Sequence, residues 1–379
     1  MTVFDDIPRR GTDPPIQNET AFGHLNRSGR TEAARVRLLV DAWFDRYPTA
    51  HRDPLVARFR SSIDDQHRSA FFELFLHELV LTSGHKVLQI EPKLAHTTKS
   101  PDFLVESAQA HRFFLEAVLA TGRSQNDVAA QARLNDVLAA LDKTPSPAHF
   151  LDISPQGTPT APISIKKMKR ELSQWIAALP ADDSAIDKAP FAYEEHGLRI
   201  TIRPFPRRNR QRIGRSIGVR HFPVQQVTVD EDIRSAIEKK ASRYGDLDHP
   251  YVVAVNAFGF FHHEEDVFDA LIGTSFTAVH QFTDGTFSTE DARKPDGIWV
   301  GPKGPRRKGL SAVLSTEQID PWNFAARHGR LVRNPWATIV LAPISLRVDQ
   351  FDPIDGGFRR TEGTTMGRIF GLPEGWPLD

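Results

Sequence analysis

Three acidic residues in the first third of the chain have the types and spacing that metal-dependent chemistry requires. Glu73 lies in an apolar helical stretch, Asp102 follows a proline, and Glu116 stands between apolar residues. Asp102 and Glu116 are 14 positions apart, which suits two short strands joined by a tight turn. Carboxylates that converge in this way are the hard oxygen ligands that Mg²⁺ and Mn²⁺ prefer.

The length of the turn decides whether two of these acids meet. If residues 108–110 form a three-residue turn, Asp102 faces Glu116 across the hairpin. Directly opposed side chains lie about 5 Å apart on one face of a sheet. Two carboxylates at that separation repel each other unless a cation lies between them. A turn of two or four residues would instead place the two acids on opposite faces.

The local patterns around these acids predict a helix, three strands, a second helix and a further strand, in that order. Apolar residues at helical spacing and a closing Ser-Gly pair mark the first helix, and short apolar runs mark the strands. This order carries one acid on the first helix and two on the hairpin that follows. The expected elements are Asp64–Ser83, Lys86–Glu91, Pro101–Ser107, Arg112–Ala120, Asn126–Leu141 and Ala148–Ile153.

With this order of elements and these acids, residues 61–153 resemble the core of the PD-(D/E)xK, or restriction-endonuclease-like, nuclease superfamily. The resemblance implies an α/β fold with an αβββαβ core and a mixed sheet. It assigns Glu73, Asp102 and Glu116 to catalysis and to binding of Mg²⁺ or Mn²⁺, which would polarise the scissile phosphate and activate water. It also implies a bacterial hydrolase that acts on DNA, in genome defence or DNA processing.

The chain departs from the superfamily pattern at one position. The triplet that begins with Glu116 ends with Val118, where the pattern has a lysine. Lys99, three residues before Asp102, and Gln131, on the following helix, are the candidates to take over the role of that lysine. The departure keeps a second interpretation open, in which the chain is a catalytically inactive, nuclease-like protein that binds nucleic acid or acts as a scaffold.

A second feature is the segment Arg199–Arg220, which holds eight arginines and no acidic residue. Arginine binds phosphate oxygens through paired hydrogen bonds, so this density predicts contact with a nucleic-acid backbone. The basic loop Lys303–Lys308 could extend the same surface. The alternative is a solvated, charged loop. The arginines expected to bind nucleic acid are Arg203, Arg207, Arg208, Arg210, Arg212 and Arg215.

The composition of the 379 residues limits the other possibilities. Basic and acidic residues are equal in number, at 48 each, so any nucleic-acid contact must come from local clustering. The absence of cysteine removes disulfides, thiolate metal sites and cysteine nucleophiles. The N-terminal stretch is polar, and no apolar run is long enough for a membrane helix. We therefore expect a cytoplasmic protein without membrane contact.

The length of the chain allows more than one domain. We expect an N-terminal arm and helix over residues 1–60, a nuclease-like core over 61–180 and a C-terminal α/β region over 181–379. The leading hypothesis is a Mg²⁺-dependent endonuclease that hydrolyses phosphodiester bonds in DNA, with a homodimer as one arrangement. The sequence leaves an RNA substrate open as an alternative.

Overall fold

The computed structural model describes residues 2–15, 19–121, 125–180, 182–207, 216–220, 229–258, 264–281 and 287–378. The chain forms two compact units. Unit 1 comprises Met1–Gly122 and Val227–Asp379, and unit 2 comprises Arg123–Gln226. Unit 2 is thus an insertion in unit 1. These limits differ from the domain limits expected near residues 60 and 180, because the chain leaves unit 1 and later returns to it.

Unit 1 is built on an eight-stranded mixed sheet with the strand order β1-β2-β3-β8-β13-β14-β15-β16. Antiparallel pairs lie at its two ends, while β3, β8 and β13 run parallel in the middle. An α/β fold with a mixed sheet is what the sequence predicted. The strands are β1 (Lys86–Ile90), β2 (Phe103–Glu106), β3 (Arg112–Ala120), β8 (Tyr251–Ala257), β13 (Ala312–Glu317), β14 (Gly329–Arg333), β15 (Asp349–Ile354) and β16 (Gly357–Thr361).

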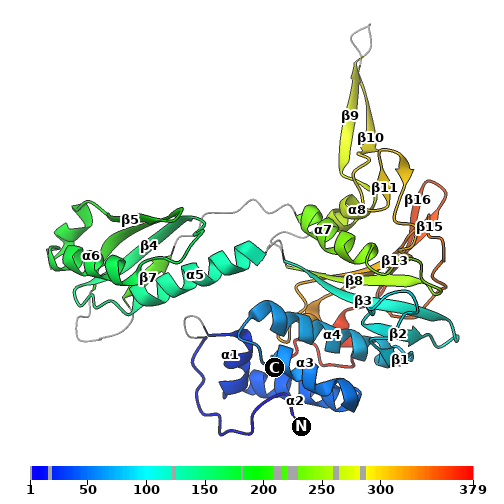
Figure 1. Cartoon of the computed structure of the whole chain (residues 1–379), viewed down its shortest axis with the longest axis horizontal. Helices are drawn as coiled ribbons and strands as arrows, with labels where there is room; N and C mark the ends of the chain where they lie inside the picture. The colour runs from blue at the N-terminus through cyan, green and yellow to red at the C-terminus, as the bar shows by residue number, and fades with distance from the viewer. Residues whose placement is uncertain are drawn as a thin grey trace. The chain divides into compact units, whose positions relative to one another are not determined.

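Helices cover both faces of this sheet (Figure 1). One face packs against a layer of N-terminal helices, in which α4 lies directly on the strands, and the other packs against α7 and α8. The helices of unit 1 are α1 (Ala21–Arg27), α2 (Thr31–Arg46), α3 (Arg52–Phe59), α4 (Asp64–Thr82), α7 (Val229–Ala241), α8 (Glu264–Ile272) and α9 (Met366–Ile369), with 3₁₀ turns η1 (Thr49–His51) and η3 (Phe324–Ala326).

The central strand β8 shows why two apolar cores form. Its seven residues are all buried, and successive side chains point to opposite faces of the sheet. Val252 and Ala254 join the core that contains α4, whereas Val253 and Val255 join the core that contains α7 and α8. A continuous apolar run is the expected sequence of a strand that is covered on both sides.

The N-terminal segment lies on the helical layer of unit 1. Val3 and Phe4 are buried, and the ring of Phe4 stacks on that of Phe22 in α1 with 5.8 Å between the centroids. The backbone N–H of Val3 donates to the Asp41 carboxylate of α2 at 2.8 Å. The expected N-terminal arm is therefore a strap that closes one side of the core.

The hairpin of β2 and β3 has the expected register. Phe103 pairs with Leu115 and Glu106 with Arg112, so that Asp102 stands opposite Glu116. The turn contains three residues, and the last of them, Ala110, adopts a left-handed conformation with φ of 61°. A left-handed residue at this place is typical of three-residue hairpin loops. The predicted pairing of the two strands is confirmed.

The described part of unit 2 contains a four-stranded sheet with the order β5-β6-β4-β7 and two helices. Leu138 of α5 and Met168 and Leu172 of α6 are buried in one core with the inward side chains of the strands. The elements are α5 (Gln125–Asp142), β4 (His149–Gly157), α6 (Ile165–Ala177), the 3₁₀ turn η2 (Asp183–Asp187), β5 (Phe191–Glu195), β6 (Leu198–Pro206) and β7 (Ile217–Arg220).

The membership of the main sheet differs from the sequence-based expectation. The helix and strand expected over Asn126–Leu141 and Ala148–Ile153 form as α5 and β4, but they belong to unit 2. The sheet neighbour of β3 is instead β8, which pairs with it in parallel. The intervening unit separates two strands that are adjacent in space by more than a hundred residues of chain.

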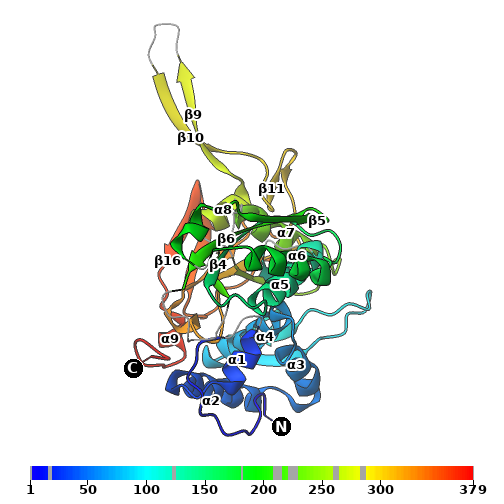
Figure 2. The same ribbon diagram turned by 90° about the vertical axis from the view of Figure 1, so that its left-hand side faces the viewer.

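A long hairpin extends from unit 1, as Figure 2 shows from the side. It consists of β9 (Ser275–Gln281) and β10 (Phe287–Arg293), and its described side chains are mostly exposed. A shorter hairpin, β11 (Val300–Gly301) with β12 (Gly304–Pro305), follows it. None of the helices in the described part of the chain has the length and apolar character needed to cross a membrane.

Candidate functional site

Glu116 is the most enclosed of the three acids. It lies in the middle of β3, and only 1% of its surface is exposed. Its Oε1 accepts a hydrogen bond from the Nζ of Lys240. Its Oε2 accepts from the hydroxyl of Tyr244 at 2.7 Å and from the backbone N–H of Asp102 at 3.2 Å. Arg243 adds a longer ion pair, with 3.7 Å between its Nη1 and the Glu116 Oε1.

The last turn of α7 and the residues just after it bring Lys240, Arg243 and Tyr244 to β3. Acidic residues in the first turn of α7, and Lys239 and Lys240 in its last turn, complement the helix dipole. Ile233 and Ile237 are buried against the sheet and hold the helix in place. The Tyr244 hydroxyl also lies 2.9 Å from the carbonyl oxygen of Ser100, which ties the end of the helix to the loop before Asp102.

Asp102 stands opposite Glu116, one residue before β2 begins. Its Oδ2 accepts a hydrogen bond of 2.6 Å from the backbone N–H of Ala117. Burial of the carboxyl group, together with the charges of Glu116 and Glu73, raises the pKa of Asp102 to about 8, and the ammonium of Lys240 opposes that rise. Ionisation of Asp102 is therefore opposed first by its burial and then by the two neighbouring carboxylates.

Glu73 approaches from α4, on the other side of the hairpin. Its Oε1 accepts from the hydroxyl of Tyr47 at 2.7 Å, and its Oε2 pairs with the Nη1 of Arg58 at 2.7 Å. Burial and the Glu73 carboxylate raise the pKa of Tyr47, so this phenol remains a hydrogen-bond donor. Glu73 is thus paired with Arg58 of α3, and its negative charge contributes to the raised pKa of Asp102.

The arrangement of the three carboxylates determines whether a divalent cation could bind beside Asp102. Within the ranges that the structure describes, no cluster of three or more His, Asp or Glu side chains is arranged to hold a metal ion. Mg²⁺, however, often uses one or two carboxylates and keeps several waters. Asp102 and Glu116 suit such a site as a pair, because a cation beside them would relieve the repulsion that raises the pKa of Asp102. Glu73, paired with Arg58, lies outside that pair.

The residues expected to replace the missing lysine lie on elements other than the strand that carries Glu116. Lys99 is exposed in the loop before β2, and Gln131 lies on α5 of unit 2, where its amide donates to Asn135 at 3.0 Å. Val118 is half-buried and packs in the core beneath α7. The ammonium beside Glu116 comes from Lys240, which the sequence analysis did not select.

Only part of the arginine segment falls within the described residues. Arg203 is exposed on β6, whereas Arg207 is 7% exposed, and its guanidinium lies 4.1 Å from the ring centroid of Phe150. Arg208, Arg210, Arg212 and Arg215 lie outside the residues that the structure describes.

Two arginines of the basic loop Lys303–Lys308 form ion pairs with helix α7. Arg306 and Arg307 both pair with the carboxylate of Glu238 on α7, at 2.8 and 2.6 Å. These contacts brace the same helix that carries Lys240. They also neutralise part of the charge that was expected to extend a phosphate-binding surface.

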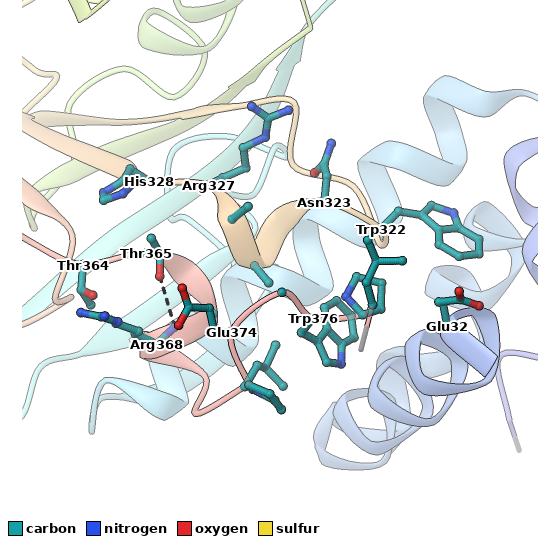
Figure 3. A pocket seen from close by; sticks show the side chains of 18 of the residues that line it. Glu32, Trp322, Asn323, Arg327, His328, Thr364, Thr365, Arg368, Glu374 and Trp376 are labelled. Atoms are coloured by element: carbon teal, nitrogen blue, oxygen red, sulfur yellow. Dashed lines mark hydrogen bonds between the residues drawn. The ribbon is translucent and has the colours of Figure 1, made fainter. Parts of the chain in front are cut away.

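A separate pocket of about 1070 Å³ lies in unit 1, beside the C-terminal segment. Figure 3 shows Trp322, Arg327, Arg368 and Trp376 among the side chains that line it. None of the residues that line it belongs to the cluster around Asp102. The candidate site is therefore defined by converging polar side chains and not by this pocket.

Two residues of the site, Lys240 and Tyr244, were missed because they come from a segment more than a hundred positions beyond Glu116. The local sequence offered one signal, a helix that ends in Lys239-Lys240 followed by an isolated tyrosine. No protein-family model matches this chain, and comparisons with curated proteins and with solved structures found no similar protein. Its function must therefore be inferred from this geometry.

Proposed function

We propose that the protein is a metal-dependent nuclease that hydrolyses phosphodiester bonds in DNA. The observation that carries the proposal is the contact of the Lys240 ammonium with Glu116, directly beside Asp102. Two acids from a hairpin and one lysine are the residue types of the PD-(D/E)xK site. Here the lysine comes from a helix and not from the strand that carries Val118.

The order of elements in unit 1 supports the same proposal. With unit 2 set aside, the chain runs α4, β1, β2, β3, α7, β8, and β8 lies parallel to β3. This is an αβββαβ order, in which α7 and β8 take the positions that the sequence analysis gave to α5 and β4. A restriction-endonuclease-like core interrupted by an insertion accounts for this arrangement.

The roles of the side chains follow from their contacts. Asp102 and Glu116 would hold the cation through Asp102 Oδ2 and Glu116 Oε1, which each accept a single hydrogen bond from the described residues. A carboxylate oxygen has two lone pairs and can accept a donor as well as a metal. Tyr244 keeps the Glu116 carboxylate oriented. The Lys240 ammonium sits where it can stabilise negative charge on an attacking water or on the phosphate. The bound cation would supply Lewis acidity and a water of lowered pKa.

A second candidate function is a nucleic-acid-binding protein without catalysis. It is favoured by the protein partners that already engage both oxygens of Glu116 and both oxygens of Glu73. In that case the ion pairs only stabilise the fold, and a cation would gain little by entering.

Incubation of the purified protein with supercoiled plasmid, linear DNA and RNA distinguishes the two functions. A nuclease cleaves at least one substrate with Mg²⁺ or Mn²⁺ and none with EDTA. Retention of these substrates on the protein without cleavage under any metal condition would favour the second function.

A further inference from the structure

One face of the sheet in unit 2 carries no helix among the described residues. Alternate residues of β4 and β6, such as Ile153 and Ile202, point into the core that α5 and α6 cover (Figure 1). The residues between them must therefore point to the opposite face. That face is called the open face below.

The open face displays an aromatic pair. Phe150 of β4 is directly opposite Phe205 of β6. The Phe205 side chain is 62% exposed, although phenylalanine is usually buried. Phe150 is half-buried, and the Arg207 guanidinium lies over its ring. An exposed ring on a flat sheet, next to a second ring, is a surface on which a planar group can stack.

Charged groups accompany the aromatic pair. Arg203 and Arg199 are exposed on β6, on the same face as Phe205, two and six residues before it along the strand. Asp152 stands opposite Arg203, and Glu194 of β5 stands opposite Arg199. The face is therefore mixed in charge, with basic groups beside the rings and no dense positive field.

We propose that the open face binds an unpaired nucleic-acid strand. A base stacks on Phe205, and Arg203 and Arg199 contact phosphates along the strand. Stacking on an aromatic ring requires a base that is free of its own partners, which excludes an intact duplex. The inference goes beyond the proposed nuclease function, because it concerns unit 2 alone and needs no metal.

Fluorescence anisotropy in EDTA tests the proposal with the full chain. The probes are labelled oligo-dT and oligo-U of about 12 nucleotides, a length within the usual site sizes for single strands, and a duplex of the same length. Phe205→Ala should weaken binding of the single strands by about 5- to 100-fold. Binding of the duplex should change by less than about twofold. Tighter binding of either dT or U supports the proposal and shows which of these two strands is preferred.

Two further variants separate stacking from general apolar contact. Phe205→Trp should keep the affinity of the parent protein, whereas Phe205→Leu should lose it, because leucine has no π-face. Phe287→Ala is the matched control, since Phe287 is 63% exposed but lies on β10 of unit 1. It should bind single strands as the parent protein does.

The dependence on salt supplies an independent readout. Because acidic residues offset the arginines of this face, the slope of log affinity against log salt should be shallow, about −0.7 for each phosphate contact. Arg203→Ala should reduce the magnitude of this slope by about 0.7, the value for one phosphate contact. The proposal is overturned if the parent protein fails to bind single strands in EDTA, or if Phe205→Leu binds them as well as Phe205→Trp does.

Discussion

At the scale of single residues, the ion pair of Lys240 with Glu116 is the feature on which the site depends. Glu116 is buried, and removal of its ammonium partner would leave a charge with weaker compensation. We expect Lys240→Ala to lower the free energy of unfolding by about 3 kcal/mol, the lower end of the range for a broken buried pair, because Tyr244 still donates to Glu116. Urea denaturation measures this change.

The neighbouring lysine provides the control for that experiment. Lys239 is exposed and lies on the same turn of α7, so Lys239→Ala should change the stability by less than about 0.5 kcal/mol. Equal effects of the two substitutions would mean that the contact with Glu116 contributes nothing specific.

The titration of Asp102 makes a prediction about the protein in EDTA. Its pKa is about 8 in the folded protein and about 4 in the unfolded chain, so the folded state binds more protons between these values. This group therefore lowers stability as the pH rises toward 8. Asp102→Asn removes the effect, and its stabilisation relative to the parent protein should be larger at pH 8 than at pH 5.

Thermal unfolding of both proteins across this pH range provides the measurement. The difference between the two curves reports Asp102 together with the carboxylates whose charges act on it, because distant titrating groups such as the buried His67 contribute equally to both. A difference in stability that stays constant with pH would contradict a proton held by Asp102.

At the scale of elements, the hairpin and α7 show what sequence patterns can and cannot reveal. The period-two pattern and the three-residue turn are local, so the register of β2 and β3 and the approach of Asp102 to Glu116 could be predicted. The position of Lys240 could not. It depends on a parallel pairing of β3 with β8 across an inserted unit, and local patterns carry no information about such a contact.

Moving the lysine from position 240 on α7 to position 118 on β3 tests whether an ammonium group from either element can stabilise Glu116. Position 118 lies two residues from Glu116 on the same face of β3, about 7 Å away along the strand. Val118→Lys in a Lys240→Ala background should recover more than half of the lost stability. In the parent background the same change should be destabilising, because it adds a second ammonium beside Lys240.

A double-mutant cycle of these variants gives the coupling between the two positions. We expect a coupling free energy above about 0.5 kcal/mol in the direction of rescue. Strict additivity would show that Lys240 acts by packing and not by its charge near Glu116.

At the scale of the whole molecule, the chain is an α/β unit interrupted by a second α/β unit. The fold class could be predicted from the order of helical and extended patterns. The limits of the insertion could not, because α5 and β4 have ordinary patterns that would also suit the main sheet. Only the pairing of strands shows that β4 belongs to the sheet of unit 2 and not to the main sheet.

This organisation predicts that unit 1 folds without the insertion. Its sheet and both of its cores are formed by its own residues. Replacement of residues 123–226 by a Gly/Ser linker of about 12 residues, which spans on the order of 20 Å, should leave a protein with a single cooperative thermal transition. Loss of that transition would show that unit 1 requires contacts from unit 2.

We propose that Asp102, Glu116 and Lys240 form a hydrolytic metal site. The test is the single-turnover rate of DNA cleavage in Mg²⁺ or Mn²⁺, measured for the parent protein and for Asp102→Asn, with a cooperative thermal transition of each protein as evidence that it is folded. We predict metal-dependent cleavage by the parent protein and a rate at least about 100-fold lower for the variant, because a metal ligand is lost while the fold is kept. Cleavage at equal rates by both proteins, or the absence of cleavage by a parent protein that binds DNA, would contradict it.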